Sequence, residues 1–464
     1  MYLRIVAGPH DGIFGQQQRF SSSSSNSSTA RSSEYDENTM SSESRLSLLH
    51  HQAESPSVID RRQDGSPERA AAPAPLSAAS FSGRDMVCFS HDWSGDPLSK
   101  THLMRILSRQ NRVLWVNSIG YRAPTVSKAD LMRIFHKLKA AASSLREVEP
   151  NIFVLNPLAI PFYRFAFVRH LNRLLLQFQV KRAFRRLRFS RPINWVFNPA
   201  AAIIAGSVGE DKMIYYCVDE YAAFEGVDAP QFAALEEKLL RDADMVIVSA
   251  RSLHQTKSKI NPRAHLVRHG VDFSHFRTSL DDATTVPEEI ADLPGPVIGY
   301  FGLMSNDWVD VDLLVHVART FSEGSLVLLG KVAMDLSRLE SLPNVHLPGR
   351  VPYETLPSYC KGFDVAIIPF PISDVTLNAN PLKAREYLAA GLPVISTSIP
   401  EVEVLGTCAI GKTPDQFCER IRDALQAPGP CVERSETMRS ESWESRVGEI
   451  QGLFDQSVAA AKAA

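Results

Sequence analysis

Short apolar runs separated by helical stretches recur along most of this chain, and this alternation constrains the fold more than any other feature. The runs are apolar throughout, as in "MVIVSA" (245–250) and "VAIIPF" (365–370). Such runs are typical of strands buried on both faces, as in parallel sheets covered by helices. The pattern therefore predicts an α/β protein built from doubly wound sheets.

The alternation occurs twice, with an interruption at 281–294. Expected strands lie at 86–90, 113–117, 152–156, 193–198, 213–219, 245–250 and 265–270, and then at 296–302, 325–330, 346–349, 365–370 and 393–398. We interpret 85–280 and 295–430 as two Rossmann-like domains joined by a linker at 281–294. Ligands of such sheets bind beyond the carboxyl ends of the strands. A cleft between the two domains is therefore the expected site.

The two ends of the chain differ from this pattern. Residues 1–84 are rich in serine and poor in large apolar residues, so we expect a disordered extension and linker there. Near the other end, Trp443, Val447, Ile450 and Phe454 recur at helical spacing. Residues 431–464 are therefore expected to contain a C-terminal crossover helix that packs back on the domains.

Charge and cysteine usage narrow the class of protein. The net charge is −2, so the molecule as a whole has no general attraction to nucleic acid. The six cysteines are scattered, without CxxC pairs or Cys/His clusters, which favours reduced thiols in a cytoplasmic protein and argues against a zinc site. No apolar run is long enough for a transmembrane helix, and no secretory signal is expected.

The stretch "LNANPLKAREYLAAGLPVIST" (377–397) contains a short helix with an unusual start. Asn380 is expected to cap this helix, with Pro381 at its first position. Lys383 then lies in the first turn, where the partial positive charge of the helix disfavours a cation unless an anion binds from outside. Glu386 lies three residues on, at a neighbouring position of the same helix face. The two side chains suit a diphosphate and sugar hydroxyls, although a surface ion pair is the alternative.

The whole stretch resembles the donor-binding helix "PLK-x-x-EYLA-x-G-x-PV" of GT-B glycosyltransferases, particularly the group that builds bacterial surface polysaccharides. Similar segments occur in the same order: "DWSGDPLSKTHLMRIL" (92–107), "VRHGVDFSHF" (267–276), "GYFGLMSNDWVDVDLL" (299–314) and "GRVPYETLPSYCKGFDVAIIPF" (349–370). The resemblance implies that a nucleotide-diphosphate sugar lies in the cleft. It also implies that Lys383 contacts the diphosphate, that Glu386 holds the ribose, and that Asn380 and the glycine turn at Gly302 border the donor.

Two departures from the resembled pattern concern the donor. Many retaining relatives carry a glutamate eight residues before the helix glutamate, and here that position is Asn378. The resembled group also often has an Arg and a Lys after the glycine turn, which "LMSNDWVD" lacks. Arg350 is a candidate helper for the diphosphate, and a solvated loop arginine is its alternative role.

Acid–base candidates follow two buried strands of the first domain. Asp219 ends the strand "MIYYCVD", where a carboxylate can take the proton of an acceptor hydroxyl in an inverting mechanism, unless it only caps a turn. Glu220 is expected to face solvent. His91 and Asp92 end the first strand and are candidates for catalysis and acceptor contact. His102, on the first helix, matches a histidine of the resembled group, with packing against the sheet as the alternative.

The acids of "DVD" (310–312) invite a metal interpretation, but they precede an apolar helix and are better explained as its N-terminal cap. The resembled enzymes generally hold the diphosphate without a bound metal. We therefore expect no metal requirement and no cofactor besides the nucleotide-sugar substrate.

Residues 161–191 contain nine Arg/Lys residues and no acid, with apolar residues at roughly helical spacing. A basic amphipathic helix suits the anionic inner face of a cell membrane, and an ordinary domain helix with a basic face is the alternative. The leading hypothesis is a glycosyltransferase that moves a sugar from a nucleotide-diphosphate sugar to a glycan or lipid-linked acceptor. A nucleotide-sugar epimerase and a non-catalytic nucleotide-sugar-binding protein are the alternatives.

Overall fold

The computed structural model describes residues 81–118, 145–160 and 166–463, which lie within one compact unit, 73–464. The disorder expected for 1–84 thus falls mostly outside the described residues. Phe81, near the end of that range, is buried, and its ring centroid lies 4.7 Å from that of Phe454. Packing into the core therefore begins at least four residues before the boundary at residue 85.

The first sheet has eight strands in the order β3-β4-β2-β1-β5-β6-β7-β8. Its strands are β1 (Asp85–Phe89), β2 (Arg112–Val116), β3 (Leu145–Glu149), β4 (Ile152–Leu155), β5 (Ile193–Val196), β6 (Lys212–Cys217), β7 (Met245–Val248) and β8 (Ala264–Leu266). All neighbours pair in parallel except β3 with β4. The edge strand β3 was not expected, because its sequence "LREVE" is polar and only one of its sides pairs with another strand.

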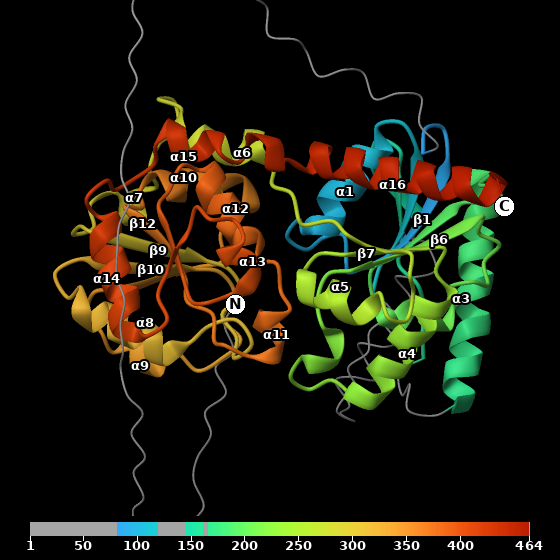
Figure 1. The fold of residues 1–464 in the computed structure, drawn as a ribbon, viewed down its shortest axis with the longest axis horizontal. Coiled ribbons are helices and arrows are strands. Elements are labelled where there is room, and N and C mark those ends of the chain that lie inside the picture. The colour runs from blue at the N-terminus through green and yellow to red at the C-terminus, as the bar shows by residue number, and fades with distance from the viewer. Residues whose placement is uncertain (1–80, 119–144, 161–165, 464) are drawn as a thin grey trace, which may run out of the picture. The chain divides into compact units, whose positions relative to one another are not determined.

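Helices cover both faces of this sheet (Figure 1). One face packs against α1 (Ser99–Ser108) and α16 (Trp443–Ala463), and the other against α3 (Ala166–Leu187), α4 (Ala229–Asp242) and α5 (Arg251–Lys257). Adjacent residues of β1 divide between the two cores, since Val87 joins one and Cys88 joins the other. This explains why the strands are apolar throughout.

The second sheet is parallel, with six strands in the order β11-β10-β9-β12-β13-β14. The strands are β9 (Val297–Phe301), β10 (Ser325–Leu329), β11 (Val345–Gly349), β12 (Val365–Ile368), β13 (Val394–Ser396) and β14 (Ala409–Ile410). The helices between and after them are α8 (Val311–Thr320), α9 (Ser337–Glu340), α10 (Leu356–Lys361), α11 (Asp374–Leu377), α12 (Leu382–Ala389), α13 (Pro400–Glu403) and α14 (Pro414–Ala424). The strand order reverses direction between β9 and β12, which is where ligands of such sheets bind.

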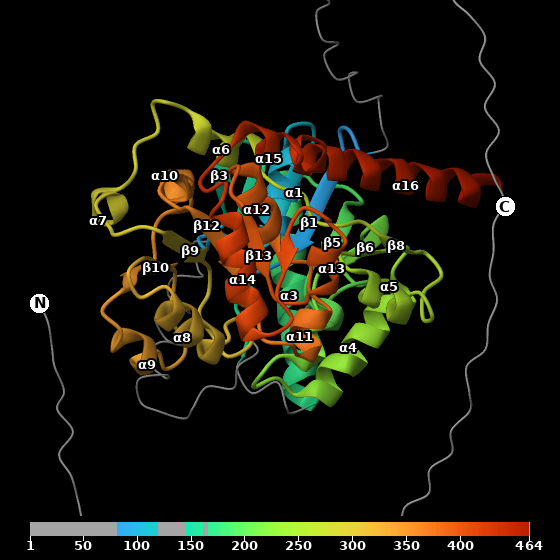
Figure 2. The same ribbon diagram turned by 60° about the vertical axis from the view of Figure 1, so that its left-hand side comes forward.

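The remaining segments connect the sheets or close the chain. The helices α6 (Phe273–Arg277) and α7 (Glu288–Ala291) lie between β8 and β9, and Ile290 of α7 is buried in the core of the second sheet. The chain then returns through α15 (Val432–Glu436) to α16, which Figure 2 shows as one long helix ending near the C-terminus. Val447, Ile450 and Phe454 of α16 join the core that contains α1.

The predicted class, two doubly wound α/β units with a C-terminal crossover helix, is confirmed. In the part of the chain that the structure describes, none of the helices combines the length and the hydropathy needed to span a bilayer.

Candidate active site

A cleft of about 760 Å³ lies at the carboxyl ends of strands from both sheets. We define it by the residues that line it: Asp92, Ser94–Lys100, Val218, Asp219, Phe224, His269, Tyr300–Leu303, Trp308, Leu329–Lys331, Arg350, Val351, Tyr353, Leu356, Phe370, Ala379–Lys383 and Glu386. Its volume is in the range of small-molecule sites. Seven of the ten site residues predicted from the sequence line it: Asp92, Asp219, Gly302, Arg350, Asn380, Lys383 and Glu386.

The start of α12 differs by one residue from the expectation. Pro381 is the N-cap and Leu382 the first helical residue, so Asn380 does not cap the helix. The Asn380 amide is engaged elsewhere: its Nδ2 donates to the Ser249 carbonyl (2.7 Å), and its Oδ1 accepts from Arg385 Nη1 (2.7 Å). Asn380 therefore ties α12 to the end of β7, which belongs to the first sheet.

Lys383 occupies the second position of α12 and lines the cleft. Its ammonium forms no hydrogen bond or ion pair with any of the described residues, and Nζ lies 5.9 Å from the centroid of the Phe301 ring. Desolvation lowers the pKa of Lys383, while Glu386 and Asp96 act to raise it. A methyl group at Gly302 would come within 2.2 Å of Lys383 Cε, so this glycine leaves room for the lysine side chain.

Glu386 lies one turn further along α12 and shares the same wall of the cleft. Its carboxylate has no hydrogen-bond or ion-pair partner among the described residues. Burial raises the pKa of Glu386 to about 7, with Lys383 opposing and Asp272 adding to that effect. Lys383 and Glu386 are therefore two partly buried ionisable groups that lack a hydrogen-bond or ion-pair partner among the described residues. Such groups with shifted pKa values are typical of ligand-binding and catalytic sites.

Asp219 follows β6 and lines the cleft from the first sheet. Burial raises the pKa of Asp219 to about 6, and the nearby Lys100 opposes this rise. Lys100 was not predicted as a site residue. It occupies the second position of α1, as Lys383 does in α12, and it too lines the cleft. The signal was present in the sequence, because "PLSK" (97–100) resembles "PLK" (381–383).

Arg350 follows β11 and forms an ion pair that joins the two sides of the cleft. Its Nη2 lies 2.6 Å from Oδ1 of Asp96, which belongs to the loop between β1 and α1. Both side chains are more than half exposed. Arg350 is thus an exposed loop arginine, as in the alternative considered from the sequence, and it also lines the cleft and pairs with Asp96.

His91 does not line the cleft. Its Nδ1 lies 3.1 Å from Ser90 Oγ, and its ring packs edge-on against Trp115 with centroids 5.3 Å apart. Burial lowers the pKa of His91 to about 3, with Lys100 adding to the effect. The residue predicted as a catalytic histidine is thus a weak base turned toward the packed interior.

His102 and Asn378 also lie outside the cleft wall. The His102 ring stacks on Trp443 of α16 at a centroid distance of 5.8 Å, and burial lowers its pKa to about 4. Its Nδ1 lies 4.0 Å from Asp272. Asn378 donates from Nδ2 to the Asp374 carbonyl at 2.7 Å, which closes the turn after α11. For His102 the structure shows packing between α1 and α16 in place of contact with the cleft.

Glu220 does not face solvent as expected. Lys257 Nζ lies 2.8 Å from both Glu220 Oε2 and Glu236 Oε2, and this network is largely buried. The Glu236 carboxylate also accepts from Tyr215 at 2.8 Å. The network fixes the segment that follows β6 and thereby the position of Asp219.

The first acid of "DVD" caps a helix, as predicted. Asp310 is the N-cap of α8, and its Oδ1 accepts from the backbone N–H of Leu313 at 3.0 Å. Asp312 pairs with Arg338 at 2.5 Å. Among the described residues no group of three or more His, Cys, Asp or Glu side chains is arranged to hold a metal ion.

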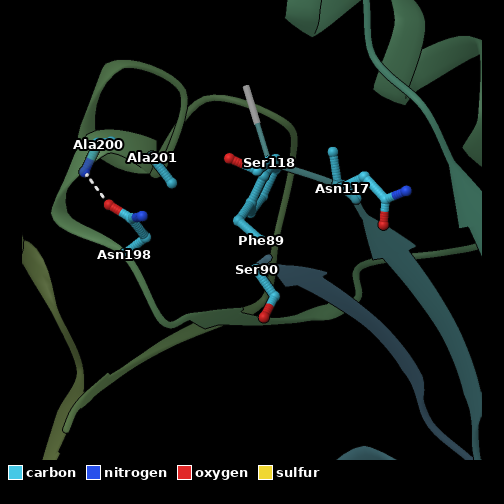
Figure 3. A pocket seen from close by; sticks show the side chains of 8 residues that line it. Phe89, Ser90, Asn117, Ser118, Asn198, Ala200 and Ala201 are labelled. Carbon is cyan, nitrogen blue, oxygen red and sulfur yellow. Dashed lines mark hydrogen bonds between the residues drawn. The ribbon is translucent and has the colours of Figure 1, made fainter. Parts of the chain in front are cut away.

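A second, much smaller pocket lies at the carboxyl ends of β1, β2 and β5 (Figure 3). Its volume is about 10 Å³, which is the space for one water molecule. Figure 3 shows Asn198 beside it, with Oδ1 accepting from the backbone N–H of Ala200 at 3.0 Å. This pocket is too small for a nucleotide or a sugar.

Part of the chain is similar to known proteins. Residues 295–427, which contain the second sheet and α12, match the model of the family described as Glycosyl transferases group 1. The chain is also 24% identical over 222 residues to TuaH of Bacillus subtilis (strain 168), which is named as a candidate teichuronic acid biosynthesis glycosyltransferase. That match covers 44% of this chain and 55% of TuaH, so the chain spans about half the length of this curated relative.

Solved structures share the fold over most of the chain. Sucrose-phosphate synthase from Thermosynechococcus elongatus matches with a TM-score of 0.60 at 16% identity, covering 81% of this chain and all of that one. Anabaena Alr3699/HepE, solved in complex with UDP-glucose, matches with a TM-score of 0.52 at 12% identity, covering 82% of this chain and all of that one. At these identities the likeness establishes the fold, which is GT-B. The resemblance stated from the sequence is therefore confirmed for the fold and for residues 295–427.

Proposed function

We propose that this chain, with its GT-B fold and its match to the glycosyltransferase group 1 family, transfers a sugar from a nucleotide-diphosphate sugar to an acceptor hydroxyl. The observation that carries the proposal is the unpartnered pair on α12. Lys383 and Glu386 face one cleft, and neither has a hydrogen-bond or ion-pair partner among the described residues. A diphosphate satisfies the ammonium and the free amides of the helix start, and ribose hydroxyls donate to the carboxylate.

Asp219 is the proposed acceptor-side base. It lines the same cleft from the other sheet, and its raised pKa, about 6, lies near the pH at which a general base works best. In an inverting transfer the Asp219 carboxylate takes the proton of the acceptor hydroxyl. The acceptor oxygen then bonds to the anomeric carbon, and the nucleoside diphosphate leaves with the electron pair of the broken bond. Lys383 stabilises the charge that develops on the leaving diphosphate.

The acceptor is proposed to be a growing surface polysaccharide or a lipid-linked glycan. Support comes from the similarity to TuaH, whose name refers to teichuronic acid biosynthesis. The order of motifs along 92–370, similar to the surface-polysaccharide group, agrees with it. No metal is assigned a role, because Lys383 and the amides at the start of α12 are the groups proposed to carry the diphosphate charge.

The test is a panel of nucleotide-diphosphate sugars screened by thermal shift on the purified full chain, followed by product analysis with the best donor. One donor should raise the melting temperature, and Lys383→Ala should weaken its binding roughly 10- to 100-fold, since a hydrogen bond to a charged group is lost. Lys412→Ala, an exposed lysine of the same half of the chain, is the matched control and should bind normally.

Product analysis separates the candidate functions. A new glycosidic linkage supports transfer. Interconversion of the free nucleotide sugar indicates an epimerase, and binding without turnover, across a panel of acceptors, indicates a binding protein. An unchanged donor affinity in Lys383→Ala places the donor site elsewhere.

A further inference from the structure

The long helix α3 has apolar residues on two opposite faces, and only one of them belongs to the core. Leu176, Val180 and Phe184 pack into the core of the first sheet, and Asn172 on the same side is fully buried. Asn172 holds the preceding segment by a hydrogen bond from Nδ2 to the Ile160 carbonyl (2.8 Å) and another from the Ile160 N–H to Oδ1 (2.7 Å). This face is therefore fixed inward.

The opposite face presents large apolar side chains to the outside. Leu171, Leu174 and Phe178 are 47%, 50% and 57% exposed. Their spacing of three and four residues places them in one stripe, roughly 10 Å long at the rise of an α-helix. Figure 1 shows α3 at the margin of the helices that cover this face of the sheet. Core packing explains the inner face of α3 and leaves this stripe without a role.

Basic side chains continue the same outer face toward the C-terminal end of the helix. Lys181, Arg182 and Arg185 are exposed, and at 100° per residue they lie within about 60° of the apolar stripe. Arg173 and Arg186 are exposed too, although they lie further round the helix from the stripe. None of these five cations forms an ion pair with another described residue, and the helix carries no acid. The outer face thus combines exposed apolar groups with uncompensated positive charge.

We propose that this outer face of α3, comprising Leu171, Leu174, Phe178, Lys181, Arg182 and Arg185, docks the protein on an anionic lipid surface. The apolar side chains enter the boundary between headgroups and acyl chains, and the cations bind the lipid phosphates. An acidic protein partner fits the charges but gives less reason for three neighbouring large apolar side chains. The sequence pattern at 161–191 indicated such a surface in general, and the structure specifies which side chains form it. The proposal goes beyond the transfer reaction and does not depend on the donor.

The test uses the full chain and unilamellar vesicles in a co-sedimentation assay. The protein should bind phosphatidylglycerol vesicles and not phosphatidylcholine vesicles, and binding should weaken between about 0.1 M and about 1 M salt. The triple variant Leu171→Ser, Leu174→Ser, Phe178→Ser should reduce partitioning onto phosphatidylglycerol roughly tenfold or more. A second variant, Lys181→Gln, Arg182→Gln, Arg185→Gln, tests the charges separately and should remove most of the salt dependence.

The matched control replaces exposed apolar residues in the other half of the chain. Ile372, Val404 and Val432 are 56%, 49% and 47% exposed, and changing all three to serine should leave vesicle binding unchanged. Circular dichroism establishes that each variant is folded. The proposal is overturned if the wild-type chain ignores phosphatidylglycerol vesicles at low salt, or if the α3 triple-serine variant binds them like the wild type. It is also overturned if sedimentation velocity shows that the stripe instead joins two copies of the chain.

Discussion

Arg350 donates to Asp96 across the cleft, with Nη2 2.6 Å from Oδ1, so a carboxylate from the β1–α1 loop pairs with the arginine that was assigned to the diphosphate. Asp96 also lies close enough to Lys383 to act on its pKa, which it raises. One carboxylate therefore interacts with both cations that were assigned to the donor. An incoming diphosphate has to compete with Asp96 for Arg350, and it is repelled by the same carboxylate.

We expect Asp96→Asn to tighten donor binding several-fold, because it removes a negative charge that opposes the diphosphate and frees Arg350. Donor affinity measured by calorimetry at low salt is the direct readout, and the gain should shrink as salt rises. Asp92→Asn is the matched control, since Asp92 lies in the same loop and lines the cleft but is not paired with Arg350. Weaker binding in Asp96→Asn would mean that Asp96 positions the arginine for the donor.

A second prediction concerns the space that Gly302 leaves for Lys383. Alanine at 302 puts Cβ 2.2 Å from Lys383 Cε and 2.7 Å from Tyr300 Oη, so the flexible lysine has to move. The backbone φ of Gly302 is +155°, which alanine adopts only with strain, so Gly302→Ala should lower donor affinity about as much as Lys383→Ala and should also lower the melting temperature. Gly448→Ala, where an added Cβ meets nothing within 4 Å, should bind the donor normally. If Gly302→Ala binds the donor normally, the position of the Lys383 side chain does not determine donor affinity.

The third prediction is that the partly buried, ionised Glu386 carboxylate destabilises the ligand-free protein. Its pKa is about 7 in the fold against an ordinary value of 4.5, so the unfolded chain releases this proton first as pH rises. The ligand-free protein therefore loses stability between those two pH values. Glu386→Gln carries no charge and should raise the melting temperature at about pH 8, by roughly 2 °C or more, but not at about pH 4.5. Glu354→Gln, at an exposed position on the same side of the chain, should show no such difference between the two pH values.

The sequence predicts the strands and the donor helix well because their signals are local. Strands such as β7 and β12 are apolar on both faces, which few other structures require. Helix geometry alone places Lys383 and Glu386 on one face of α12, and both line the cleft. The edge strand β3 gives no such signal, because half of its surroundings are solvent.

The direction of a side chain that follows a strand, or that lies on a helix packed on two sides, depends on contacts with distant parts of the sequence. The sequence cannot show that His102 stacks on Trp443, because α16 returns to α1 only in the folded chain. The ring of His91 packs on Trp115 of β2, a contact that depends on the pairing of β1 with β2. The sequence shows Lys100 at the start of a helix, as it does Lys383, but only the folded chain shows that Lys100 lies near Asp219, which follows another strand.

The fourth prediction links Lys100 to the pH dependence of transfer. Asp219 acts as a base only when ionised, and its pKa of about 6 predicts that kcat/KM rises with pH through about 6 and then levels off. The Lys100 charge lowers the pKa of Asp219, so Lys100→Gln should move this acid limb to higher pH while the plateau is less affected. Asp219→Asn should abolish transfer with donor affinity intact.

The control for the Lys100 variant is Lys238→Gln, which removes a charge from the exposed side of α4 and should leave the pH profile in place. If Lys100 has only a structural role, Lys100→Gln lowers the rate equally at every pH. If Lys100 acts on Asp219, the substitution shifts the pH at which kcat/KM rises. Both side chains line the cleft from the half of the chain that contains the first sheet, so this shift tests their interaction within that half of the site. An acid limb that stays at about pH 6 in Lys100→Gln, or near-normal turnover in Asp219→Asn, would remove Asp219 from the proposed mechanism.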